Sequence, residues 1–176
     1  MAAVMDAMGP PVSTTQWSPS FVAQTVEVLP VALGDDGLLW MKPLHADSLR
    51  VGLPPSSRPA EVVLEVLRWY PLNPIVVHST SWRHEEGRII LTYVAVVEHP
   101  REIAKDSLVA LPVERAELAR GEAKAAPRNI GVEAVLEHAL RHLSWLVRDD
   151  PAVMKELAAW TEVLAEFQPE PFRALI

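Results

Sequence analysis

The sequence predicts an α+β domain in which a mixed sheet packs against helices and a helical extension follows at the C-terminus. Two observations carry this prediction. Val-rich runs separated by turn residues form hairpin patterns over residues 21–44 and 73–99. Apolar residues recur at helical spacing over 132–150, and a second helical pattern follows over 149–167. Strands concentrated early in the chain and helices late are typical of α+β proteins.

The chain of 176 residues suits one domain with its own core. Residues 1–18 mix small residues and prolines without periodicity, so we expect a loose N-terminal arm. Residues 19–148 form the predicted α+β domain, and residues 149–176 a helical extension of that same domain. Apolar residues make up 49% of the chain and charged residues 22%, as in ordinary soluble proteins.

The charge balance and composition exclude several classes of function. Lys and Arg number 16 against 23 Asp and Glu, and this net charge of −7 disfavours nucleic-acid binding. The absence of cysteine excludes disulfides, thiolate metal sites and cysteine nucleophiles. The start of the chain lacks a basic signal-peptide region, and no run approaches the ~18 apolar residues of a membrane span. We therefore expect a cytoplasmic protein with no membrane or nucleic-acid partner.

The strands follow from turn signals between β-rich runs. "FVAQTVEVLPVAL" and "LLWMKPL" flank "GDDG", which predicts a hairpin with residues 34–37 at its tip. "SLRVGL" predicts a short third strand. The runs on either side of "HEEG" predict a second hairpin, where Gly87 can adopt the positive φ of a tight loop. "SLVALPV" predicts another strand, and residues 114–129 a short helix and a loop.

Three helices are predicted from caps and apolar spacing. Ser56 or Ser57 can cap the first helix, which carries Pro59 in its first turn and is stopped by Pro71. Its predicted buried face holds Val63, Val66, Leu67 and Tyr70. The helix over 132–150 buries a stripe of apolar residues, namely Val132, Val135, Leu136, Ala139, Leu143 and Leu146. Asp150 is the expected cap of a second C-terminal helix.

Three stretches in this order resemble the Nudix hydrolase superfamily. They are "RPAEVVLEVLRWYPLNP", placed like that family's catalytic helix, "VVHSTSWRHEEGRIILTYVAVVE", like the hairpin after it, and "SLVALPVERAELARG", like a later strand and turn. The resemblance spans roughly residues 20–147 and implies a Nudix-like mixed sheet packed with helices. Nudix hydrolases use clustered glutamates to hold divalent metal at a diphosphate.

The Nudix box, G-x5-E-x7-R-E-U-x-E-E-x-G-U with U apolar, is degenerate in this chain. Glu61 and Glu65 fall on the first and last of its three clustered glutamates. Five other defining positions carry a different residue type: Leu64 at the middle glutamate, Ala60 at the arginine, Leu67 at the late glycine, Ala46 at the first glycine and Gly52 at the early glutamate.

Two functions follow from this resemblance. The first is a non-catalytic Nudix-like domain that binds a small molecule, with a nucleotide-related ligand as one case, or a protein partner, and needs no cofactor. The alternative is a divergent Mg²⁺-dependent hydrolase of a nucleoside diphosphate derivative, with Glu61 and Glu65 as metal ligands. The alternative without a functional role is a solvent-exposed helix face on which Glu65 pairs with Arg68.

The candidate ligand-binding residues lie in the second hairpin: His78, Trp82, Arg83 and Tyr93. An aromatic ring could stack on a planar ligand, and Arg83 or His78 could meet an anion. Strict alternation places His78 and Trp82 on one face of the strand and Arg83 on the other. The alternative is an ordinary half-buried sheet.

His138 and His142 have the i,i+4 spacing that metal sites use, but a third ligand is not evident, and the pattern favours flanking surface histidines. Trp145 lies away from the apolar stripe of its helix. An exposed Trp there would mark an interface and predicts a homodimer formed through the C-terminal helices. The alternative is that the last two helices pack around Trp145 as core.

Overall fold

The structure is a computed structural model that describes residues 22–100, 107–116, 118 and 130–168. Its strands are β1 (Gln24–Gly34), β2 (Gly37–Pro43), β3 (Leu49–Gly52), β4 (Pro74–Glu85), β5 (Arg88–Val97) and β6 (Leu108–Pro112). They form one six-stranded sheet in the order β4-β5-β1-β2-β6, with β3 paired to β1. The predicted arm over 1–18 and nearly all of the helix and loop predicted over 114–129 lie outside the described residues.

β1 is the centre of the sheet. Along one edge it pairs in parallel with β5, whereas its other edge pairs antiparallel with β3 in its first half and with β2 in its second half. The predicted hairpin tip is confirmed, since Gly34 pairs with Gly37, whose φ is 136°. The second hairpin is also confirmed, with Gly87 at φ 78° in its turn.

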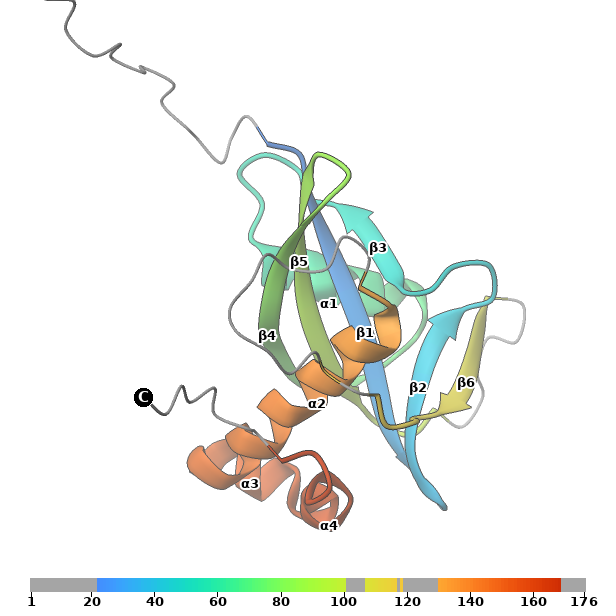
Figure 1. The fold of residues 1–176 in the computed structure, drawn as a ribbon, viewed down its shortest axis with the longest axis vertical. Helices are drawn as coiled ribbons and strands as arrows, with labels where there is room; N and C mark the ends of the chain where they lie inside the picture. The colour runs from blue at the N-terminus through green and yellow to red at the C-terminus, as the bar shows by residue number, and fades with distance from the viewer. Residues whose placement is uncertain (1–21, 101–106, 117, 119–129, 169–176) are drawn as a thin grey trace, which may run out of the picture.

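Helices cover both faces of the sheet, which confirms the predicted α+β class (Figure 1). The described helices are α1 (Pro59–Trp69), α2 (Val132–Asp149), α3 (Pro151–Glu156), the short 3-10 helix η2 (Ala158–Trp160) and α4 (Thr161–Leu164). α1 packs Val63 and Leu67 against Val26 and Val28 on one face. α2, α3 and α4 pack on the opposite face, where Leu29 and Val94 belong to the same apolar cluster as α2.

The start of α1 differs from the prediction. Arg58 occupies the cap position, and among the described residues no side chain caps this end of the helix. Ser56 instead has a φ of 67°, in a turn that ends two residues before the cap position. Pro59 lies in the first turn as predicted, where its missing N–H costs nothing. The prediction that Ser56 or Ser57 caps α1 is therefore wrong.

The buried side of α2 is rotated slightly from the predicted stripe. Leu140 and Val147 are buried together with Leu136 and Leu143, whereas Leu146 is half-buried. Asp150 caps α3 as predicted, since its Oδ1 accepts hydrogen bonds from the Ala152 and Val153 N–H groups at 2.8 and 3.3 Å.

The chain after Asp150 is not the single helix that was expected. It breaks at Leu157, passes through η2 and continues as α4. The break allows Leu157, Trp160, Leu164 and Phe167 all to be buried in the apolar cluster of α2. None of the described helices is long and apolar enough to cross a membrane.

Candidate functional site

The four candidate residues of the second hairpin lie on two faces of the sheet. A β-bulge between Ser79 and Ser81 shifts the register, so that His78 pairs with Val94 but Arg83 pairs with Ile90. His78 and Arg83 consequently both lie on the α2 face, whereas Trp82 pairs with Leu91 on the α1 face. The prediction from strict alternation, which joined His78 to Trp82, is wrong because a bulge reverses the alternation beyond it.

Trp82 and Tyr93 share the α1 face. The Trp82 side chain is 70% exposed, which leaves its ring free to contact a ligand or partner. Tyr93 is half-buried and packs against the apolar cluster beneath α1. The structure therefore separates the two aromatic candidates from the two basic ones, and a single ligand pocket formed by all four is not present in this fold.

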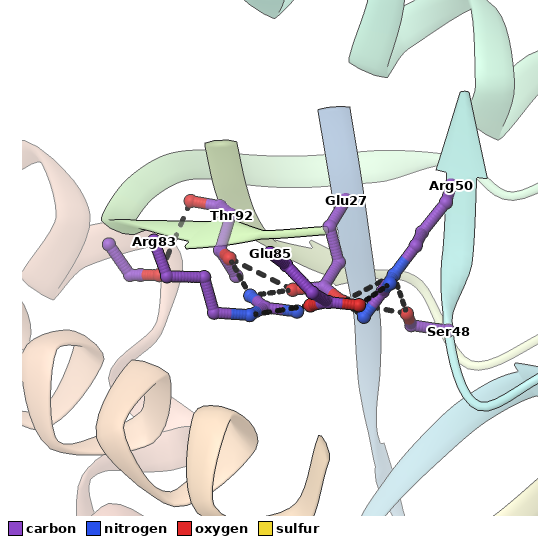
Figure 2. Close-up of polar contacts among 7 residues, drawn as sticks. Glu27, Ser48, Arg50, Arg83, Glu85 and Thr92 are labelled. Atoms are coloured by element: carbon purple, nitrogen blue, oxygen red, sulfur yellow. Dashed lines mark hydrogen bonds and ion pairs between the residues drawn. The ribbon is translucent and has the colours of Figure 1, made fainter. Parts of the chain in front are cut away.

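Arg83 is held by a buried glutamate that the sequence prediction missed (Figure 2). Glu27, on β1, has a fully buried side chain. The Arg83 guanidinium donates to both of its carboxylate oxygens, at 2.7 and 2.9 Å, in a bidentate pair. Arg50, on β3, donates to the same carboxylate at 2.9 Å.

Two hydroxyls and a second glutamate complete this Glu27 network. Ser48 and Thr92 donate to the Glu27 carboxylate at 2.8 and 2.9 Å. Glu85 accepts from both guanidinium groups, that of Arg50 at 2.7 Å and that of Arg83 at 3.1 Å (Figure 2). Two carboxylates and two guanidiniums balance in charge, so this network ties strands β1, β3, β4 and β5 together.

The electrostatics of Glu27 follow from these contacts. Burial alone would raise the pKa of the Glu27 carboxyl, but hydrogen bonds and charge from Arg83, with the Ser48 and Thr92 hydroxyls, outweigh it. Together they lower this pKa from 4.5 to about 2. Glu27 is thus ionised throughout the physiological range. A signal existed in the sequence, since this glutamate interrupts the apolar run "TVEVLPV".

A second buried carboxylate lies on α2. Glu137 is 1% exposed and accepts from Arg115 through Nε and Nη2, both at 3.0 Å. Arg141, one turn further along the helix, donates at 2.8 Å, and the Ala116 N–H donates at 3.3 Å. Burial would raise the pKa of Glu137, but these hydrogen bonds hold it below its ordinary value.

A hollow of about 470 Å³ opens beside Arg115, between the β1–β2 turn, the end of β6 and α4. Half-buried Leu39, Val113 and Val163 line it together with the edge of Phe167. Its charged lining consists of Asp35, Asp36, Glu166 and Arg115, and His99 lies among the lining residues. The Arg115 guanidinium also lies over the Phe167 ring, 4.6 Å from its centroid.

The predicted metal ligands lie elsewhere. Glu61 and Glu65 occupy the exposed side of α1, and Glu61 approaches Arg58 at 3.8 Å. Within the described ranges, no group of three His, Asp or Glu side chains is arranged to hold a metal ion. Neither glutamate lines the hollow, because α1 and α4 pack on opposite faces of the sheet.

The helix histidines are not simple surface residues. His138 and His142 are half-buried, and their ring centroids lie 4.6 Å apart. His78 of β4 is the third member of the group, 6.2 Å from His142. Trp145 is 48% exposed on the outer side of α2, as the interface prediction requires. Homodimerisation itself stays a prediction.

Comparison with known proteins finds a distant structural likeness and no sequence match. No family model matches the sequence, and no curated protein matches it. The solution structure of the E. coli ORF135 protein is 14% identical and covers 52% of this chain and 75% of its own, with a TM-score of 0.33. The crystal structure of a candidate nudix hydrolase family member from Chromobacterium violaceum is 14% identical and covers 84% and 95%, with a TM-score of 0.39. These values describe a distant likeness, and membership of the Nudix superfamily stays a prediction.

Proposed function

We propose that this protein is a non-catalytic, Nudix-like binding module that takes up a small molecule in the hollow between the β1–β2 turn and α4. The hollow itself is the observation that supports the proposal. Its volume of about 470 Å³ falls within the roughly 300–1,000 Å³ typical of ligand sites. It also combines an apolar wall with a few charged groups, as such sites do.

The charges of the lining suggest the class of ligand. Asp35, Asp36 and Glu166 bring three negative charges, whereas Arg115 brings one positive charge that already pairs with Glu137. A surplus of carboxylates favours a cation and repels a phosphate-rich ligand. We therefore infer a small ligand with an ammonium group and an apolar body, in preference to a free nucleoside diphosphate.

The apolar wall gives this ligand a second anchor. Leu39, Val113 and Val163 are half-buried, so they offer apolar surface that a ligand would remove from water. A ligand of this kind could place its ammonium group near the carboxylates and its apolar body against the apolar wall at the same time. A purely hydrophilic cation would use only the carboxylates, where solvent screening keeps the attraction weak.

A melting experiment with matched probes tests the proposal. Phenethylamine should raise the melting temperature of the protein, and 3-phenylpropionate, which carries a carboxylate on a similar body, should not. Glu166→Gln should weaken the phenethylamine effect. Glu162→Gln serves as the matched control, because Glu162 is exposed on α4, four residues before Glu166, but does not line the hollow.

The outcomes separate the parts of the proposal. Equal stabilisation by both probes would retain the hollow as a site but overturn the preference for cations. No stabilisation by either probe at millimolar concentration would count against the hollow. A rise in melting temperature that needs both Mg²⁺ and a nucleoside diphosphate, and that Glu61→Gln or Glu65→Gln abolishes, would instead support the hydrolase alternative.

A further inference from the structure

Three histidines meet where α2 crosses the sheet beside β4. The rings of His138 and His142 are in edge contact, with centroids 4.6 Å apart and planes inclined by 61°. The ring of His78 reaches His142 from the strand, at 6.2 Å. His142 is therefore the centre of a cluster that joins the helix to the sheet.

The surroundings of His78 and His138 favour the neutral form of these two rings. Burial lowers the pKa of His78 below 6.5, and the neighbouring His142 lowers it further. Burial also lowers the pKa of His138, with contributions from His142 and Arg141, against a hydrogen bond to the Thr80 backbone that acts in the opposite direction.

The charged groups around the cluster do not stabilise the positive charge of a protonated histidine. Arg141, from α2, is a cation whose own partner is Glu137. β4 contributes the His78 ring and the Thr80 backbone. Among the described residues, no carboxylate contributes to the pKa shifts of His78 or His138.

We propose that the cluster of His78, His138 and His142 is a pH-sensitive contact that weakens the packing of α2 on the sheet as the solution becomes acidic. Protonation of more than one ring places like charges within a few ångströms, in a half-buried position beside Arg141. The unfolded or detached state solvates these charges freely, so it binds the protons more readily.

The sign of the effect follows from the direction of the shifts. A histidine whose folded-state pKa lies below 6.5 binds fewer protons when folded than when unfolded. Its contribution to stability is therefore complete above pH 6.5. It declines as the pH falls from 6.5 towards the lower pKa that the histidine has in the folded state. This inference does not depend on what the hollow binds.

The effect would extend beyond α2 itself. Leu140 and Leu143 of α2 share an apolar cluster with Leu157 and Leu164, which lie in the chain after α3. A weaker contact between α2 and β4 would therefore loosen the C-terminal helices as a group. α1 packs on the opposite face of the sheet and should be unaffected.

Histidine NMR titration and amide hydrogen exchange test the proposal in EDTA-containing buffer. We expect His78 and His138 to titrate below 6.5, and both pKa values to rise in His142→Gln. After correction for intrinsic rates, α2 should exchange several-fold faster at pH 5.5 than at pH 7.5, with α1 unchanged. His142→Gln should reduce this pH dependence.

His84→Gln is the matched control, because His84 is an exposed histidine on the same strand. Its pH dependence should equal that of the unmodified protein. Titration of His78 and His138 at or above 6.5, or equal protection of α2 at both pH values, would overturn the proposal. The ring titrations of the unmodified protein decide the question even if His142→Gln fails to fold.

Discussion

Glu27 and Glu137 are two buried carboxylates with similar partners but different positions in the fold. Each pairs with two arginines, one well buried and one partly exposed. The partners of Glu27 belong to the sheet or to the residue before β3, where the backbone is fixed by ladder hydrogen bonds. Those of Glu137 are a residue of its own helix and a segment that follows β6.

A carboxylate paired with two arginines holds strands together at Glu27, whereas at Glu137 the same pairing borders the hollow proposed to bind a ligand. The Glu27 network is balanced in charge and lies within the sheet, so it fixes the strands. Arg115, in contrast, is 46% exposed and joins Glu137 to the lining of the hollow. Buried ion pairs cost much desolvation energy, and whether they add stability depends on how fully their partners are held in place.

The largest expected effect comes from Glu27→Gln. The substitution leaves Arg83, whose side chain is only 13% exposed, without its buried counter-charge. Breaking a buried pair in this way destabilises a protein by about 3–5 kcal/mol. Urea denaturation measures the change, with the exposed Glu61→Gln as control. A loss near that of the control would show that the network does not hold the sheet together.

The pH dependence of stability sharpens the same comparison. The pKa of Glu27 is lowered from 4.5 to about 2, so its contribution is present above pH 4.5 and is lost as the pH falls towards 2. A shift of this size corresponds to about 3 kcal/mol. Unfolding free energies measured across that window should decline less steeply for Glu27→Gln than for the unmodified protein. If the two proteins lost unfolding free energy equally steeply over this pH window, Glu27 would not be the group responsible for the loss.

Glu137→Gln should lower the free energy of unfolding by less than Glu27→Gln does, by about 1–3 kcal/mol. Arg115 lies in an irregular segment and is 46% exposed, so it can turn towards water when the carboxylate charge is removed, and only Arg141 then keeps a well-buried guanidinium. Urea denaturation beside Glu27→Gln provides the measurement. A cost equal to or above that of Glu27→Gln would break the distinction between the two networks.

The smallest effect on stability is expected for Trp145→Ser, within about 0.5 kcal/mol, because surface substitutions rarely exceed this. The Trp145 side chain is 48% exposed, and exposed Met154 lies nearby in sequence on α3. If a homodimer forms through these helices, the substitution should convert it to a monomer. Light scattering after size exclusion measures the mass, and a strict monomer of the unmodified protein at high concentration would contradict the prediction.

The elements of the fold were predictable because their signals are local. Glycine-containing turns predicted both hairpins, and the spacing of apolar residues predicted α1 and α2. The break at Leu157 has no glycine or proline to announce it. It follows from the need to bury Leu157, Trp160 and Phe167 against α2, a tertiary demand that overrides helical propensity.

The candidate site was less predictable, since it depends on register and on distant contacts. The bulge near Thr80 moved Arg83 to the face of His78, and alternation alone cannot foresee such an insertion. His78 joins His142 across 63 intervening residues of the printed sequence. The hollow unites four chain segments that carry no shared motif. Glu27 and Glu137 could have been singled out, because each is a charge within an apolar pattern.

An NMR titration of isotopically labelled protein with phenethylamine tests the proposed binding function most directly. We expect saturable shifts confined to amides around the hollow, at Leu39, Val113, Val163 and Phe167, with weaker affinity in Glu166→Gln and unchanged affinity in Glu162→Gln. Shifts centred instead on Trp82 or on the exposed side of α1, or no saturable shift at all, would contradict it.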